Sequence, residues 1–153
     1  MRRIALALTL ILSSSLTWPF LVRSHGEHQI DETGVEIREL GNSSKMWNGK
    51  SLPRYPDTQP EVKILDIKIP KGISLPWHYH PVINAAVILQ GRLELKLTDG
   101  TTKIFSKGEA LVEVVNTVHS GKALGPSDVH LIVFYAGENG IPSTILYKKH
   151  INP

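Results

Sequence analysis

Cysteine is absent from all 153 residues of the sequence. This absence excludes a disulfide framework, a metal site built on thiolates and catalysis by a cysteine nucleophile. Internal repeats and low-complexity tracts are also absent, and 41% of the residues are hydrophobic while 20% are charged. These proportions are ordinary for a packed globular protein, and the length fits one domain with or without a leader.

A basic excess is also lacking once the N-terminus is set aside. The chain has 17 lysines and arginines against 14 aspartates and glutamates. Arg2, Arg3 and Arg23 lie within residues 1–24, which hold no acidic residue, and removing these three leaves 14 basic residues against 14 acidic ones. The basic pI therefore comes mostly from the N-terminus and gives no support for nucleic-acid binding, which needs a clustered basic face.

The N-terminus has the pattern of a secretory signal. Arg2 and Arg3 precede apolar runs at 4–12 and 16–22, a charged start followed by a short apolar core. We expect residues 1–24 to form a signal peptide cleaved after Ser24, and the mature protein to be periplasmic or secreted with no stable membrane span. The alternative is an uncleaved anchor over residues 4–22, which the serines and Pro19 weaken.

The sequence after residue 24 predicts a succession of short β-strands. Short apolar or alternating segments are separated by Gly, Pro and Asn, and Asp99-Gly100 is a hairpin-turn signal. The expected strands cover residues 62–69, 83–90, 92–97, 103–106, 110–115, 119–123 and 129–136, with a further short one at 35–40. We predict an all-β fold with an N-terminal arm and lead-in over 25–60 and a barrel with a short C-terminal tail over 61–153.

Three histidines are the candidate chemistry of the barrel. His78 and His80 are separated by one residue, so in an extended segment they point to the same face, because side chains alternate with period two. Their imidazoles can reach one ion from one wall, and His119 on another strand would complete a three-nitrogen site.

The spacing of these residues resembles the motifs of the cupin superfamily. Gly72, His78, His80, Asn84 and Gly91 match the first cupin motif in spacing, and the segment from Gly108 to His119 resembles the second. The resemblance covers residues 60–137 and implies a double-stranded β-helix, the cupin jelly-roll barrel, in a small single-domain bacterial cupin. It also implies a homodimer.

The chain departs from the family pattern at several positions. Asn84 stands where cupins usually have a ligating Glu, and the second motif has Val114, Asn116 and Ala123 where Pro, Gly and Asn are usual. Three imidazoles still suit one divalent transition metal, whether Fe, Ni, Mn, Zn or Cu, and leave open positions for water or substrate. Three roles are open for Asn84. It binds the metal through its neutral amide oxygen, it forms a hydrogen bond to a metal ligand, or it marks a position at which the metal ligand has been lost.

Two glutamates are candidates for the missing carboxylate. Glu94 alternates with Leu93 and Leu95, so it faces water if those leucines fill the core. Glu113 alternates with Val112 and becomes a candidate catalytic base or ligand only if it points into the barrel. Trp77 and Tyr135 are candidates for lining a substrate pocket.

Two functions from different classes fit these residues. The first is an exported metal-dependent enzyme, oxygenase-like, acting on a small oxygen-bearing organic substrate; isomerase and decarboxylase activities stay open on the same scaffold. The second is a non-catalytic barrel that binds a metal or small ligand for sensing or storage. The three-histidine set favours the enzyme, and the lack of a clear general base favours the binding module.

Overall fold

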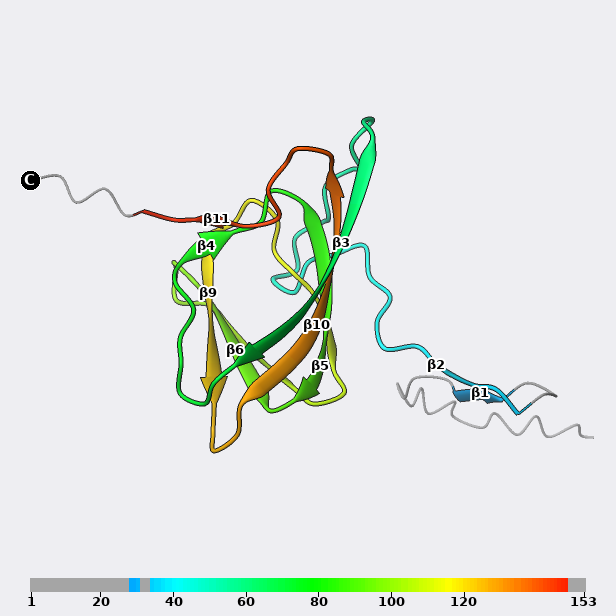
Figure 1. Cartoon of the computed structure of the whole chain (residues 1–153), viewed down its shortest axis with the longest axis vertical. Coiled ribbons are helices and arrows are strands. Elements are labelled where there is room, and N and C mark those ends of the chain that lie inside the picture. The colour runs from blue at the N-terminus through cyan, green and yellow to red at the C-terminus, as the bar shows by residue number, and fades with distance from the viewer. Residues whose placement is uncertain (1–27, 31–33, 149–153) are drawn as a thin grey trace, which may run out of the picture.

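The computed structural model describes residues 28–30 and 34–148, so the predicted signal peptide over 1–24 lies outside the described residues (Figure 1). The described part is all β, and none of its residues form a helix able to span a membrane. The strands are β1 (His28–Ile30), β2 (Glu36–Arg38), β3 (Pro60–Ile69), β4 (His78–Tyr79), β5 (Ile83–Gln90), β6 (Arg92–Leu97), β7 (Thr102–Ser106), β8 (Ala110–Val112), β9 (His119–Leu124), β10 (Val129–Glu138) and β11 (Ile145–Leu146).

Two antiparallel sheets face each other and enclose the core (Figure 1). One sheet has the order β3-β10-β5-β8 and the other β11-β4-β9-β6-β7, so strands distant in sequence lie side by side. The main core cluster draws on both sheets, with Ile88 and Leu131 from the first and Leu93, Leu95 and Phe105 from the second. This arrangement confirms the predicted double-stranded β-helix.

Strand β6 shows the alternation that the sequence predicts. Leu93, Leu95 and Leu97 are buried, whereas Arg92 and Lys96 are exposed. Glu94 lies between the buried leucines on the outward side of the strand, which agrees with its expected orientation.

Strand β5 is almost wholly apolar in sequence, yet only one of its faces is buried. Asn84, Ala86 and Ile88 are buried, but the alternate residues from Ile83 to Val87 are only half-buried. The second sheet covers only the inner face. The outer face receives partial cover from the lead-in loop, since Ile83 packs against a small cluster that contains Met46.

The lead-in and the tail both attach to the barrel near the same end. The main-chain N–H of Trp47 donates to the Val112 carbonyl at 2.9 Å, and the Trp47 side chain packs against the core. Strand β11 pairs with β4, with Leu146 opposite His78. The predicted strand at 35–40 is shorter, and as β2 it pairs with β1 in a separate two-stranded sheet.

Gly91 makes the sharp turn between β5 and β6 and has no room for a side chain. Its φ is +79°, and a Cβ there would lie 2.3 Å from the Asp128 carbonyl oxygen. Gly125 has nearly the same φ, +81°, but a Cβ on it meets nothing within 4 Å.

We therefore expect Gly91→Ala to destabilise the protein much more than Gly125→Ala. The left-handed conformation costs either alanine roughly 1–2 kcal/mol, and only Gly91→Ala adds a clash with the main chain. Urea denaturation of both variants measures the difference. Equal losses of unfolding free energy would show that the Asp128 segment moves away freely.

Candidate metal centre

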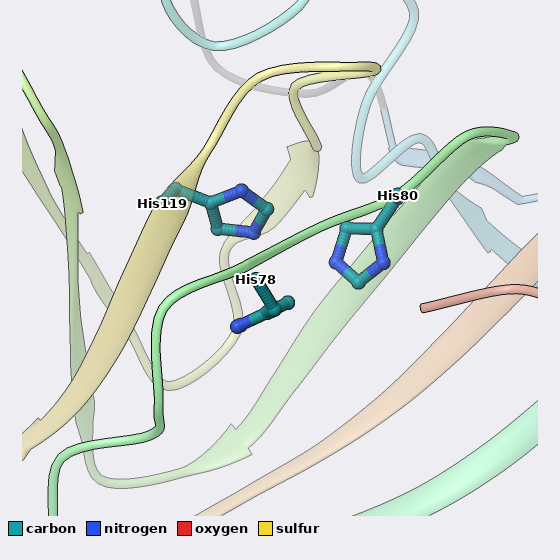
Figure 2. Close-up of side chains that lie close together, drawn as sticks. All are labelled: His78, His80 and His119. Carbon is teal, nitrogen blue, oxygen red and sulfur yellow. The ribbon is translucent and has the colours of Figure 1, made fainter. Parts of the chain in front are cut away.

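The three candidate histidines converge inside the barrel (Figure 2). His78 lies on β4 directly opposite His119 at the start of β9, and His80 follows two residues after His78 on the same side. All three are buried, with exposed fractions of 8%, 5% and 1% for His78, His80 and His119. Their ring centroids are 4.5–5.0 Å apart, and one nitrogen from each ring lies within 4.8 Å of the others.

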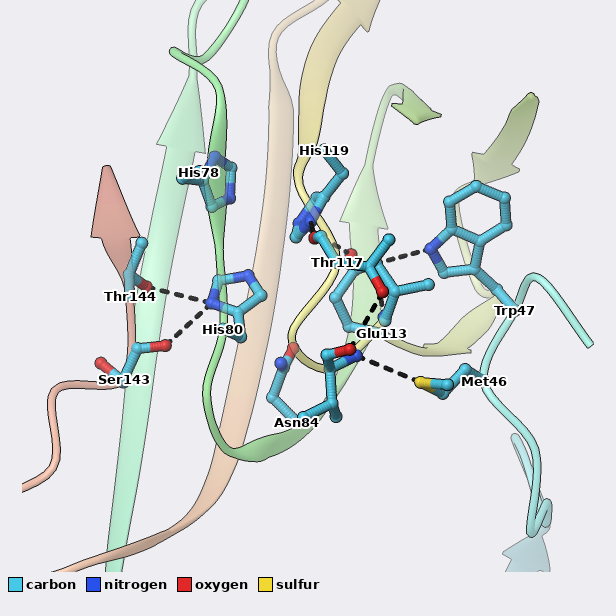
Figure 3. A network of polar contacts seen from close by, with 12 residues as sticks. Met46, Trp47, His78, His80, Asn84, Glu113, Thr117, His119, Ser143 and Thr144 are labelled. Atoms are coloured by element: carbon cyan, nitrogen blue, oxygen red, sulfur yellow. Dashed lines mark hydrogen bonds and ion pairs between the residues drawn. The ribbon is translucent and has the colours of Figure 1, made fainter. Parts of the chain in front are cut away.

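Each of the three rings is held by a main-chain carbonyl through Nδ1, and Figure 3 shows these bonds for His80 and His119. The acceptors are the carbonyl oxygens of Pro76 for His78 at 2.7 Å, Ser143 for His80 at 2.8 Å and Thr117 for His119 at 2.8 Å. A carbonyl oxygen can only accept, so each Nδ1 carries the proton and donates it. In the neutral rings Nε2 is then left as the free electron-pair donor.

Burial keeps the imidazoles neutral. Desolvation lowers the pKa of His80 from 6.5 to about 4, and it also lowers the pKa values of His78 and His119. A metal competes with protons for the same nitrogen, so rings that are already neutral favour metal binding. Three buried imidazoles with fixed Nδ1 protons are thus a donor set that fits one transition-metal ion and leaves further positions open.

Glu113 points into the barrel beside His119. Its Oε1 accepts from the Trp47 indole N–H at 2.6 Å and from the Val114 N–H at 2.8 Å, while its Oε2 lies 3.9 Å from Nε2 of His119 (Figure 3). The side chain is only 5% exposed, and burial raises the pKa of its carboxyl from 4.5 to about 7. Because the His119 ring is neutral near pH 7, this contact is not an ion pair.

The carboxylate of Glu113 stands next to the histidine cluster and is not one of its mutually close donors. Among the described residues, only the three histidines form a group whose possible ligand atoms all lie within 4.8 Å of one another. Glu113 is therefore placed to exchange a hydrogen bond or proton with whatever occupies the centre.

Asn84 lies on the inner face of β5 and is 2% exposed. Its main-chain carbonyl accepts from the Glu113 N–H at 3.0 Å, and its strand partner on β10 is Tyr135. The position that usually supplies a carboxylate in cupins is thus directly beside the buried carboxylate of Glu113.

A cavity of about 270 Å³ opens onto the histidines. Tyr135 lines this cavity, with its ring centroid 5.5 Å from that of His80, whereas Trp77 is 37% exposed and is not among the lining residues. Burial raises the pKa of the Tyr135 hydroxyl, so it stays protonated at neutral pH. The lining comprises Leu65, Ile67, Ile69, Leu75, Pro76, His78, His80, Asn84, Ala86, Leu93, Leu95, Leu111, Glu113, His119, Gly121, Leu131, Val133, Tyr135, Thr144 and Leu146.

Three contributors to the site could not be recognised from the sequence. Trp47 is 66 residues from the carboxylate that it anchors, and Ser143 is 63 residues from the ring that it fixes. Thr144 places its hydroxyl oxygen 3.2 Å from the same His80 nitrogen.

The family comparison covers the central part of the chain. The family model described as a cupin domain matches residues 65–135, which contain the three histidines, Asn84, Glu113 and Tyr135. No curated protein sequence matches the chain.

Solved structures share the fold at low sequence identity. The DMSP lyase DddQ from Ruegeria pomeroyi DSS-3 aligns with a TM-score of 0.51 and 16% identity, over 60% of this chain and 45% of the lyase chain. A structure of the DMSP lyases RdDddP and RnDddQII aligns with a TM-score of 0.50 and 15% identity, over 57% of this chain and 44% of the lyase chain. This chain thus spans less than half the length of those lyases.

An uncharacterised double-stranded β-helix protein from Klebsiella pneumoniae has a more similar size. It aligns with a TM-score of 0.50 and 17% identity, over 63% of this chain and 90% of its own. At these identities the likeness concerns the fold alone. The matched family model shows that residues 65–135 form a cupin domain, and the two facing sheets and the structural neighbours agree with a double-stranded β-helix.

Proposed function

We propose that this protein is a metal-dependent enzyme that acts on a small oxygen-bearing organic substrate, with oxygenase-type chemistry in which dioxygen is the co-substrate. The observation that carries the proposal is the common orientation of the three rings. Each Nδ1–H is bound to a main-chain carbonyl, so the Nε2 atoms of His78, His80 and His119 are left to bind one ion.

A divalent transition metal in this position would polarise a substrate oxygen. The residues of the chain would do the remaining work. Glu113, anchored through Oε1, keeps Oε2 available to take or return a proton beside His119. Tyr135 offers a protonated hydroxyl to the cavity, and the apolar walls keep water from the reacting groups.

The buried carboxylate favours catalysis over simple metal storage. A binding module needs only the three imidazoles, whereas Glu113 adds a group whose pKa of about 7 suits proton transfer near neutral pH. The absence of a carboxylate at Asn84 favours the alternative, a barrel that binds metal or ligand without turnover.

We expect the purified protein, prepared without a histidine tag or chelator, to hold about one equivalent of one transition metal, because three protein ligands fill one site. His78→Ala should lose this metal and keep the fold. His130→Ala is the matched control, since His130 binds Asp66 on the outside of the barrel at 2.7 Å. Metal analysis with circular dichroism measures both.

Metal that survives His78→Ala would contradict the assignment of the centre. The storage alternative is tested with the Mn²⁺- or Cu²⁺-loaded protein by water-proton relaxation. An enzyme with open metal positions should enhance the relaxation of bulk water through exchange, whereas a closed storage site should not.

We expect Glu113→Gln to change how the stability of the metal-free protein depends on pH. Between about pH 4.5 and pH 7 the folded wild type keeps a proton that the unfolded chain releases. The wild type should therefore lose about 3 kcal/mol of unfolding free energy relative to Glu113→Gln as pH rises through this window.

Urea denaturation of both proteins with a chelator present gives this difference directly. The buried histidines titrate in both proteins, so their contribution cancels apart from the charge interaction between His78 and Glu113. Parallel stability curves would mean that the carboxyl of Glu113 ionises as it does in water, and its role as a proton-transferring group would then lose its support.

The proposal includes export and pairing. The charged and apolar pattern of residues 1–24 supports a cleaved signal peptide and a periplasmic or secreted protein. Exposed apolar side chains on neighbouring strands, Ile64 at 64% and Phe134 at 42%, support a homodimer through the outer face of the first sheet. Native mass spectrometry of the exported protein should show two chains that each lack residues 1–24; a single full-length chain would contradict both.

A further inference from the structure

The inner face of the first sheet changes from polar to apolar in one step below the histidines. Asn84 on β5 lies opposite Tyr135 on β10, and both line the cavity next to the histidine cluster. One layer further along, Ala86 lies opposite Val133, and both also line the cavity. Beyond them, Ile88 pairs with Leu131 in the core.

The second sheet repeats this order. His119 at the start of β9 is followed on the same face by Gly121, which lies opposite Leu95 on β6. Ala86 and Gly121 therefore stand in the layer directly below the polar groups, one from each sheet. A Cβ on Gly121 would lie 3.2 Å from Cδ1 of Leu93, so leucines already fill the space on that side. The free space at this depth therefore lies on the side of the first sheet, beside Ala86 and Val133.

The polar groups of the cavity all belong to the cluster around the histidines. Thr144 lies 3.2 Å from His80, the Tyr135 ring is next to His80, and Glu113 lies beside His119. The remaining lining comes from leucine, isoleucine, valine, alanine, proline and glycine. Among the described residues, no lysine or arginine lines the cavity, and Glu113 is its single carboxylate.

This distribution decides between classes of ligand. A sugar or polyol would bury hydroxyl groups against leucines and valines, and each unpaired hydroxyl would lose its hydrogen bonds to water. A phosphate ester or dicarboxylate would bring a second charge into walls that hold no lysine or arginine to pair with it. A compound with one oxygen-bearing head and a hydrocarbon body matches both parts of the cavity.

We infer that the substrate of the proposed enzyme is a small amphiphile with a single oxygen-bearing head, such as a monocarboxylate, and an unsubstituted hydrocarbon body. The head contacts the histidine centre, and the body fills the space beside Ala86 and Val133. This inference rests on the proposed function for the head and on the cavity walls alone for the body. The volume of about 270 Å³ is just below the usual range of ligand pockets and limits the body to a few carbons.

The test is a titration of the Co²⁺-loaded protein with straight-chain monocarboxylates from acetate to octanoate, followed by visible absorption and calorimetry. Affinity should rise about three- to fourfold per added methylene until the cavity is full, and then stop rising. 6-Hydroxyhexanoate is the matched probe for hexanoate, since it has the same carboxylate and chain length but places a hydroxyl at the far end, away from the metal. 6-Hydroxyhexanoate should bind less tightly than hexanoate.

Two variants locate the hydrocarbon body. Ala86→Leu fills the space, so the preferred chain should become shorter while acetate affinity and cobalt content stay unchanged. Val133→Ala enlarges the space and should move the preference to a longer chain. Because Val133→Ala removes atoms and adds none, it keeps the test informative if Ala86→Leu fails to fold.

The outcomes separate the two proposals. If cobalt binds but affinity does not depend on chain length, or 6-hydroxyhexanoate matches hexanoate, the substrate class is wrong and the metal centre stands. If cobalt does not bind, the proposed function fails, and calorimetry of the metal-free protein with the same acids tests the cavity alone. Chain-length dependence there would support the hydrocarbon site, and no uptake of any acid would overturn it.

Discussion

The hydrogen bonds from three Nδ1–H groups to main-chain carbonyls are the interaction on which the centre depends. Buried imidazoles are costly unless their polar atoms have partners. The carbonyls of Pro76, Thr117 and Ser143 satisfy one nitrogen of each ring and fix its orientation. The second nitrogen of each ring then faces the cavity. The same bonds therefore make the burial tolerable and define where an ion can be held.

The cupin domain over 65–135 does not complete this arrangement alone. Trp47 enters from the lead-in loop and holds one oxygen of Glu113, so that the other oxygen faces His119. Ser143 and Thr144 enter from the tail and contact His80. The barrel supplies all three histidines and orients two of them, and the flanking segments hold His80 and Glu113.

The sequence predicts those parts of the structure that depend on local alternation. Leu93, Leu95 and Leu97 fall on one face of β6 because residues two apart share a face, and the same rule brings His78 and His80 together. Asn116 also has a local reason. Its φ is +50°, a conformation that asparagine adopts more readily than other non-glycine residues, so it replaces the usual glycine of the second motif.

Alternation could not predict the position of Glu113. Strand β8 ends at Val112, and Glu113, Val114 and Val115 are all buried in succession. The chain there packs against the lead-in loop on one side and the cavity on the other, so period two no longer applies. The partners of the site residues are likewise set by contacts across more than sixty residues of chain, as between His80 and Ser143. No spacing in the sequence reveals such pairs.

The contribution of Ser143 also has a consequence for the order in which the protein is made. His78, His80 and His119 leave the ribosome well before the residue whose carbonyl fixes the His80 ring. A nascent chain can form most of both sheets while this ring is still free to rotate. The centre becomes complete only when Ser143 and β11 dock beside β4. The docking of the tail is thus a late folding step that completes the histidine cluster.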